Sequence, residues 1–230
     1  MPPEFGDPNA PTRPVWLVRQ TTNGPQLPDA ITEADAAWAR AQGFAGRTGQ
    51  ICLLPDHAGG IAGALYGIGR ESPRHHRERY VLATAAEKLP AGNWRLANQP
   101  AGFDPALGAL GWLFAQYRFG RYKKAEPASA YLVCPEGVDA KRISALAEGE
   151  FLVRDLINTP ASDMGPAQLE QAARDLAARH GAQISVITGD ELIARNFPMI
   201  HAVGRAGAEP PRLLDLRFEG RGPRVTLVGK

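Results

Sequence analysis

The chain has 230 residues, of which 44% are hydrophobic and 22% charged, close to the average of soluble globular proteins. This composition excludes a fully disordered chain, a collagen and a coiled coil. Its 26 basic and 24 acidic side chains leave a net charge of +2, too small an excess to indicate a general binder of polyanions. The sequence shows neither a membrane-spanning run nor a secretory leader at its N-terminus. We therefore expect a cytoplasmic protein of one large or two small domains.

Both cysteines lie in apolar runs, Cys52 after an isoleucine and Cys134 after a valine. Two cysteines cannot form a disulfide framework. The sequence predicts that both are buried strand thiols in a reducing compartment.

Proline and glycine set the boundaries of the elements expected in the N-terminal half. Five prolines among the first fourteen residues predict a flexible arm over residues 1–13. Residues 80–87 fit a helix and a strand equally well and stay unassigned. The other expected elements are strands at 15–18, 50–54 and 94–97, a helix at 33–41 between Thr32 and Gly43, and a weak or edge strand at 61–69.

Helix signals are clearer in the second half of the chain. Asp104 followed by proline predicts a helix that continues through Tyr122, and Asp139 opens a helix that Thr159 and Pro160 stop. The apolar face of that second helix is expected at Ile143, Leu146, Val153 and Ile157. The remaining expected elements are a strand at 130–134, a helix at 166–180 closed by Gly181, a strand at 184–187, a short helix after the capping-box spacing of 188–191, and strands at 213–218 and 225–228.

Strands that alternate with helices predict an α/β fold. We expect an N-terminal α/β domain over residues 14–138, a linker helix over 139–158 and a second domain over 159–230. In open parallel sheets the chemistry lies in loops that follow the carboxyl ends of strands. No such loop follows Val228, so we expect the second domain to be truncated.

Several polar clusters have both a functional and a structural interpretation. Residues 70–79 hold four arginines and two histidines, but the glutamates among them favour a solvated loop without a metal at His75 and His76. Residues 117–124 alternate aromatic and basic side chains, a pattern that suits nucleic acid but more often ends a helix. The glycines of 204–207 give a weak phosphate-loop pattern. None of these is a complete catalytic site.

Four segments together resemble one protein family, that of the leucyl (cytosol) aminopeptidases. The first, FLVRDLINTPASDMGP, contains an Asn-Thr-Pro motif followed by a small-residue turn and a second proline. The four segments are residues 151–166, residues 202–213 with AVGRA and PPRL, residues 225–230 with VTLVGK, and residues 117–123 with YRFGRYK. Their order along residues 104–230 makes the resemblance specific, whereas residues 1–100 show none.

The resemblance implies a macro-like N-terminal α/β domain, a linker helix and the first part of an α/β catalytic domain. Members carry two divalent metal ions, zinc or manganese, form hexamers and remove an N-terminal residue, often leucine, from peptides through a metal-activated water. It implies one metal ligand in this chain, Lys230, and no catalytic residue, so the chain alone is expected to be inactive. The alternative is a non-catalytic assembly or nucleic-acid-binding module, although neither a nucleic acid nor a membrane is the expected partner.

Overall fold

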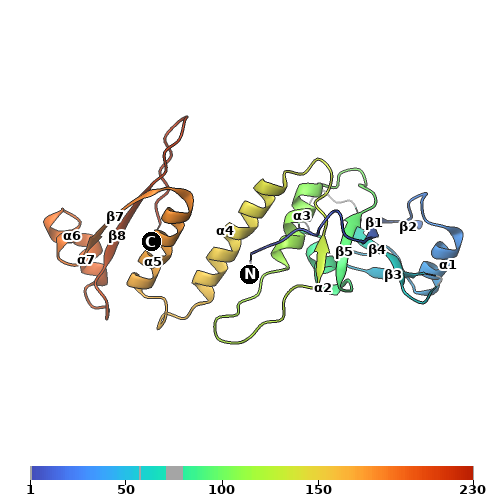
Figure 1. Cartoon of the computed structure of the whole chain (residues 1–230), viewed down its shortest axis with the longest axis horizontal. Coiled ribbons are helices and arrows are strands. Elements are labelled where there is room, and N and C mark those ends of the chain that lie inside the picture. Colours follow the sequence, from blue (N-terminus) through green and yellow to red (C-terminus); the bar gives the residue numbers. More distant parts are fainter. Residues whose placement is uncertain (1, 57, 71–79, 230) are drawn as a thin grey trace. The chain divides into compact units, whose positions relative to one another are not determined.

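The computed structural model describes residues 2–56, 58–70 and 80–229. Its internal contacts divide the chain into a first unit that ends at Asp155 and a second unit that begins at Leu156. Both units combine helices with strands (Figure 1), which confirms the expected α/β class.

A six-stranded mixed sheet forms the centre of the first unit. Its strands are β1 (Thr12–Thr21), β2 (Gly24–Gln26), β3 (Ile51–Pro55), β4 (Ile61–Gly69), β5 (Gly92–Leu96) and β6 (Ala130–Leu132). The order is β3-β4-β1-β5-β6, and β2 pairs with the end of β1. The pairs β1/β4, β1/β5 and β5/β6 are parallel, whereas β3 runs antiparallel to β4.

Helices cover both faces of this sheet. They are α1 (Glu33–Ala41), α2 (Ala83–Lys88), α3 (Pro105–Phe114) and α4 (Ala140–Asn158). Successive side chains of a strand point to opposite faces of the sheet. In β1, Leu17 belongs to the hydrophobic cluster formed with α2, α3 and α4, and Val18 belongs to the hydrophobic cluster formed with α1. Thr32 caps α1 and Asp104 caps α3 through their side chains, as the sequence predicts.

The N-terminal segment is anchored, so the flexible arm expected over residues 1–13 is wrong. The Gly6 amide donates to the Leu132 carbonyl at 2.8 Å, which extends the β6 edge of the sheet. The buried Gln116 amide exchanges two 2.8 Å hydrogen bonds with the backbone of Glu4. Residues 2–11 belong to no helix or named strand, but side-chain and edge hydrogen bonds hold them, and β1 begins at Thr12.

The glycine-rich strand β4 lies between β3 and β1 and is therefore not the expected edge strand. At Gly67 a Cβ would lie 2.1 Å from the Arg47 carbonyl oxygen. The loop before β3 crosses here, and the Gly67 amide donates to the Gln50 carbonyl at 2.8 Å. The glycine thus marks a close approach of two backbones rather than a weak strand.

The helix expected to run through Tyr122 ends at Phe114. The carbonyls of Ala115 and Tyr117 accept hydrogen bonds from the Arg118 guanidinium, each at 2.8 Å, which satisfies the helix end. Side chains that bind the last carbonyls commonly end a helix in this way.

The buried face of α4 differs from the expected one. Ile143 is buried as predicted, but Leu146 and Val153 are each 48% exposed. The side chains buried with Ile143 are instead Ala147 and Phe151. The expected and the observed sets of buried side chains both include Ile143 and both follow helical spacing, so periodicity alone could not distinguish them.

The second unit contains α5 (Pro166–His180), β7 (Gln183–Thr188), α6 (Glu191–Ala194), α7 (Pro198–Gly204) and β8 (Arg212–Arg217). Gly181, at φ 66°, closes α5 as predicted. The strands β7 and β8 form an antiparallel pair. Helix α7 was not expected from the sequence, and Asp190 starts α6 without a side-chain cap.

The strand expected at residues 225–228 is absent from the described structure. Val225 is 76% exposed and Leu227 and Val228 are 93% exposed. A strand exists only when its backbone pairs with a neighbour, and none of the described residues pairs with this segment. Among the described residues, no helix has both the length and the apolar character that crossing a membrane requires.

Candidate functional site

The one metal ligand expected from the sequence, Lys230, lies outside the described residues. The same holds for His75 and His76 and for the rest of residues 71–79. Within the described part of the chain, no three His, Cys, Asp or Glu side chains lie close enough together to hold a metal ion. The described residues therefore do not make up a metal centre.

The Asn-Thr-Pro motif forms a tight turn between α4 and α5. Asn158 is the last residue of α4, and Thr159 is buried at 6% exposure. The Pro160 carbonyl accepts hydrogen bonds from the amides of Asp163 at 2.8 Å and Met164 at 2.9 Å. The motif thus ends one helix and directs the chain into the next, as the proline in it predicts.

Four charged side chains connect α5 with β8. Glu170 contacts Arg174 at 2.7 Å and Arg212 at 2.6 Å, and Arg212 also lies 3.6 Å from Glu209. The pKa of Glu170 lies below its ordinary value, mainly because Arg174 donates a hydrogen bond to it. Desolvation raises this pKa, and the charge of Arg212 lowers it further. Since these charges neutralise one another, the cluster supports the fold and offers no free acid or base.

The two thiols suit packing rather than nucleophilic chemistry. Cys52 is buried in β3, as expected, whereas Cys134 is only partly buried just after β6. Burial raises the pKa of both thiols, and the charges of Asp35 and Asp139 raise them further. A thiol held protonated is a poor nucleophile and a poor metal ligand.

The aromatic and basic segment at residues 117–124 is partly engaged in internal contacts. Tyr117 packs edge-on against Phe151, with ring centroids 5.1 Å apart, and its hydroxyl donates to Asp155 at 2.8 Å. The Arg121 guanidinium lies over the Tyr122 ring at 5.7 Å. The segment follows α3 instead of forming its end, since the helix stops at Phe114, and Tyr122 is 54% exposed, so Tyr117 and Arg118 are the residues of the segment that the helix-end interpretation describes.

The glycines of residues 204–207 do not form a phosphate loop. Gly204 is the last residue of α7, so the motif follows a helix instead of leading from a strand into one. A Cβ at Gly204 would lie 2.4 Å from the Pro211 Cβ. The glycine is needed because the chain that leads into β8 packs directly on the end of α7.

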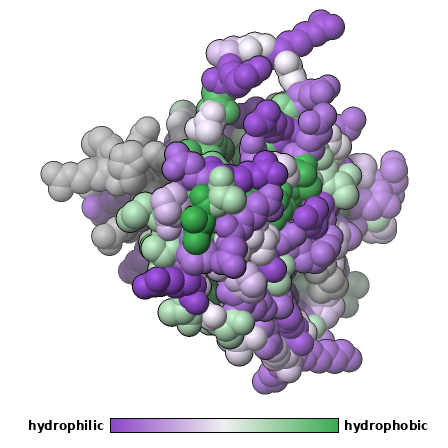
Figure 2. All heavy atoms as spheres, turned by 90° about the vertical axis from the view of Figure 1, so that its left-hand side faces the viewer, coloured by the Kyte–Doolittle hydropathy of each residue, from purple (hydrophilic) through white to green (hydrophobic). Residues whose placement is uncertain are grey.

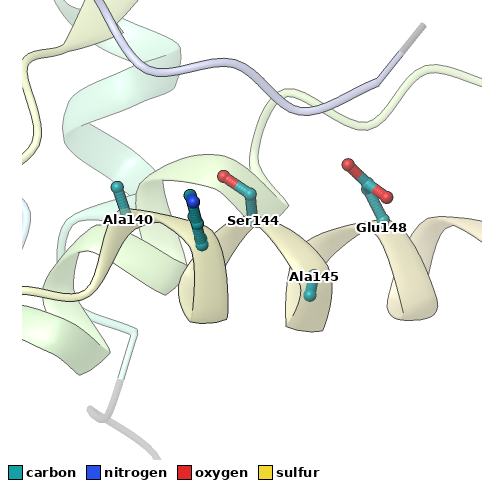
Figure 3. A pocket seen from close by; sticks show the side chains of 5 residues that line it. Ala140, Ser144, Ala145 and Glu148 are labelled. Carbon is teal, nitrogen blue, oxygen red and sulfur yellow. The ribbon is translucent and has the colours of Figure 1, made fainter.

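One pocket, of about 340 Å³, lies along the exposed side of α4 and is open to solvent. Figure 3 shows its short side chains and the Glu148 carboxylate along the helix; the residues that line it are Ala140, Lys141, Ser144, Ala145 and Glu148. One lysine and one glutamate on a shallow helix face cannot enclose a substrate. We assign no reaction to it.

The fold and the turn after α4 define a class of protein in which an N-terminal α/β unit precedes a second α/β unit that is entered from a long helix. A family model for the M17 aminopeptidase N-terminal domain matches residues 15–135. A model for the catalytic domain of the cytosol aminopeptidase family matches residues 151–230. The chain belongs to the cytosol aminopeptidase family, which confirms the resemblance found in the sequence.

Proteins of known sequence and structure agree with this assignment. A probable cytosol aminopeptidase from Geobacter sp. (strain M21) is 32% identical over 84% of this chain and 44% of its own length. The crystal structure of the cytosol aminopeptidase from Coxiella burnetii superposes with a TM-score of 0.78 at 30% identity, over 92% of this chain and 45% of that one. The bottromycin maturation enzyme BotP, described in complex with Mn, superposes with a TM-score of 0.70 at 25% identity. The match covers 91% of this chain and 46% of the BotP chain. The chain spans about half the length of these relatives.

Proposed function

We propose that this chain forms part of a metal-dependent aminopeptidase that releases N-terminal residues, leucine among them, from peptides. The observation that carries the proposal is the order of two matches along one chain, an M17 N-terminal domain followed by a cytosol aminopeptidase catalytic domain. The preference for leucine rests on the resemblance of the motifs at residues 151–166 and 225–230.

Two divalent metal ions, zinc or manganese, are part of the proposal. The relative BotP is described in complex with Mn, which supports a divalent metal. Lys230 is the proposed ligand from this chain. The resemblance implies no other metal ligand and no catalytic residue in this chain, so the proposal names none.

The Lys230→Met variant tests the proposal in a protein of the relatives' full length. A lysine binds a metal only through its unprotonated amine, and methionine removes that donor without deleting core volume. We expect the variant to lose one metal and to hydrolyse leucine p-nitroanilide at least ~100-fold more slowly. Metal content is measured by mass spectrometry, and Lys141→Met, on the exposed side of α4, is the matched control.

Calorimetric titration of residues 1–230 with zinc or manganese tests metal binding independently of peptidase activity. The proposal predicts negligible heat, because one proposed ligand, Lys230, is too few to hold a metal ion tightly. Tight stoichiometric binding by this chain, or an unimpaired Lys230→Met enzyme, would show that the lysine assignment is wrong.

The alternative function is a non-catalytic module for assembly or nucleic-acid binding. Residues 117–124 are the segment that would carry the second of these, but Arg118 is bound to the end of α3 and Arg121 to Tyr122. A salt-dependent gel shift would support the alternative. Its absence, together with metal-dependent hydrolysis, would support the aminopeptidase.

The hexamer, the cytoplasmic location and the domain limits at 14–138, 139–158 and 159–230 belong to the same proposal. The relatives are named cytosol aminopeptidases, which supports the location. Sedimentation of the longer protein tests the hexamer. Helix α4 belongs mainly to the first unit, since the two units divide after Asp155.

A further inference from the structure

Strand edges of the first unit are more specific binding features than the exposed apolar side chains of the molecule. On the face that Figure 2 shows, hydrophobic residues lie in small groups among hydrophilic ones, which is ordinary for a protein surface. The end strands of the sheet in the first unit are β3 and β6. Unpaired N–H and C=O groups along such a strand bind further strands, so each end strand is a place where an extended peptide can pair.

The outer side of β6 is covered by one side chain and by one segment of the chain. The Trp112 indole donates to the Ala130 carbonyl at 3.1 Å. The Leu132 carbonyl, two residues further along the same side of the strand, accepts from the Gly6 amide at 2.8 Å. Gly6 lies parallel to the strand, in a bridge with the residue that follows Leu132. Residues 3–6, which we call the N-terminal strap, therefore close this edge.

The strap contacts the first unit in the way that a bound peptide contacts its receptor. Pro3 is buried, and Phe5 packs against the main hydrophobic core. Between them, the Glu4 amide donates to the Gln116 side chain, and the Glu4 carbonyl accepts from it, each at 2.8 Å. Glu4 itself is exposed, so this position is held through its backbone and accepts any side chain.

The last position of the strap is restricted to glycine. Gly6 is buried, and a Cβ added to it would lie 2.7 Å from the Asn93 Oδ1 atom and 3.3 Å from the Val133 amide nitrogen. A larger residue would push the backbone away from β6. The contacts of the four positions thus define a pattern of proline, any residue, an aromatic residue and glycine.

The strap is joined to β1 by a linker that takes little part in packing. Residues 7–11 belong to no helix or named strand, and all of them except the half-buried Ala10 are exposed. The strap can therefore leave the edge without disrupting a strand of the sheet. While it stays tethered, its effective concentration at the edge is on the order of millimolar, which keeps the edge closed.

We propose that the β6 edge and Gln116 form a binding site for an extended segment of another polypeptide, and that the strap closes this site in cis. The segment would carry the pattern of proline, any residue, an aromatic residue and glycine. Strand addition to a sheet edge is a recurring mode of peptide recognition, with main-chain hydrogen bonds for affinity and side-chain pockets for specificity. A second copy of the chain gains nothing here, because its strap is already held by its own sheet. This inference concerns the first unit and does not depend on the proposed peptidase activity.

Peptide binding to a chain whose own strap is disabled tests the proposal. Phe5→Asp combined with Gly6→Val sets a carboxylate against the core and a side chain where only glycine fits, so the strap should leave the edge. The peptide Pro-Pro-Glu-Phe-Gly-Asp, which has the sequence of residues 2–7, is titrated into residues 1–230 labelled with nitrogen-15. We expect saturable shifts of the amide signals of residues 130–133 in the variant. Binding to the wild type should be at least ~10-fold weaker, because the tethered strap competes.

A matched peptide and a matched variant serve as controls. The peptide Pro-Pro-Glu-Phe-Val-Asp should leave these signals in place, because its valine would meet Asn93. Gln116→Leu in the disabled chain should weaken binding at least ~10-fold, since the two hydrogen bonds to the peptide backbone are lost. Gln42→Leu, at the exposed end of α1, should leave binding unchanged. Tryptophan fluorescence checks folding, and Gly6→Val alone, which keeps Phe5, replaces the double variant if that variant unfolds.

Four outcomes would overturn the proposal. The first is a folded, strap-disabled chain that does not bind the peptide, because the strap would then be a structural element only. The second is equal binding by the wild type and the disabled chain, and the third is binding that Gln116→Leu leaves unchanged. The fourth is a dimer of wild-type residues 1–230 that excess peptide dissociates, because the strap would then be exchanged between two copies.

Discussion

At the residue scale, Tyr66 combines complete burial with hydrogen bonds to residues at the start of α2. Tyr66 of β4 is fully buried and its hydroxyl donates to the Val81 carbonyl just before α2. Burial raises the pKa of Tyr66 to about 12, and the charge of Glu87 raises it further, while a hydrogen bond with Thr84 opposes the shift. The phenol therefore joins the sheet to α2 only while it keeps its proton.

Because of Tyr66, the stability of the first unit should decrease at alkaline pH. An unfolded tyrosine titrates near pH 10, so above that pH the unfolded chain loses a proton that the folded chain retains. Its contribution is complete below pH ~10 and is lost as pH rises toward about 12, by at most ~1.4 kcal/mol per pH unit. Urea unfolding of the wild type and of the Tyr66→Phe variant at several pH values measures this contribution to the unfolding free energy, because the other titrating groups are the same in the two proteins. A difference in unfolding free energy that stays constant from about pH 9 to about pH 11 would contradict it.

At the scale of elements, α4 is held to the first unit near its C-terminal end. The Arg154 guanidinium lies 5.4 Å from the ring centroids of both Phe114 and Tyr117, and it donates to Glu150 at 2.9 Å. The Tyr117 hydroxyl bonds to Asp155, the last residue of the first unit. A planar cation between two rings is a contact that arginine makes better than lysine.

Arg154→Ala should loosen the end of α4 without unfolding the helix start. We expect amide exchange over residues 150–155 to rise ~10-fold, while residues around Ile143 stay protected by the core. Arg154→Lys should give an intermediate effect, because it keeps the charge and loses the planar stacking. The control is Arg142→Ala, an exposed position of the same helix. Equal exchange in Arg154→Ala and the control would show that the ring contacts do not hold α4.

At this scale, the sequence predicts a structural feature well when the residues that cause it lie close to it in the sequence. The cap at Thr32 and the terminator at Gly181 were predicted, because each acts within a few residues of its own helix. The central position of β4 and the buried face of α4 were not predicted, because each depends on a contact with a residue far away in the sequence. Gly67 of β4 lies against the Arg47 carbonyl, and Phe151 of α4 packs against Tyr117. The family was recognised from short motifs, whereas the metal site was not located, since its one expected ligand is Lys230 and the described residues contain no cluster.

At the scale of the whole molecule, the unequal cores imply unequal stability. Burial of apolar area is the main favourable term in folding, at ~25 cal/mol per Å². The second unit buries Ala177 and Leu192 among its described residues, and the ion pairs around Glu170 add a surface contribution only. Contacts within the first unit, including the anchored N-terminal segment, do not depend on the second. The two units should therefore unfold as separate cooperative steps.

The positions of the tryptophans make this separation measurable. The chain has four tryptophans, and all of them, Trp16, Trp38, Trp94 and Trp112, belong to the first unit. Their fluorescence reports the first unit alone, whereas the far-ultraviolet circular dichroism also reports helix α5 of the second. In urea we expect the dichroism of residues 1–230 to fall in an early step, before the fluorescence changes, because the unit with the smaller core unfolds first. Leu192→Ala should move the early step to lower urea, since it opens a cavity in that core, and should leave the fluorescence transition in place. Coincident transitions of the two probes would mean that the second unit is as stable as the first.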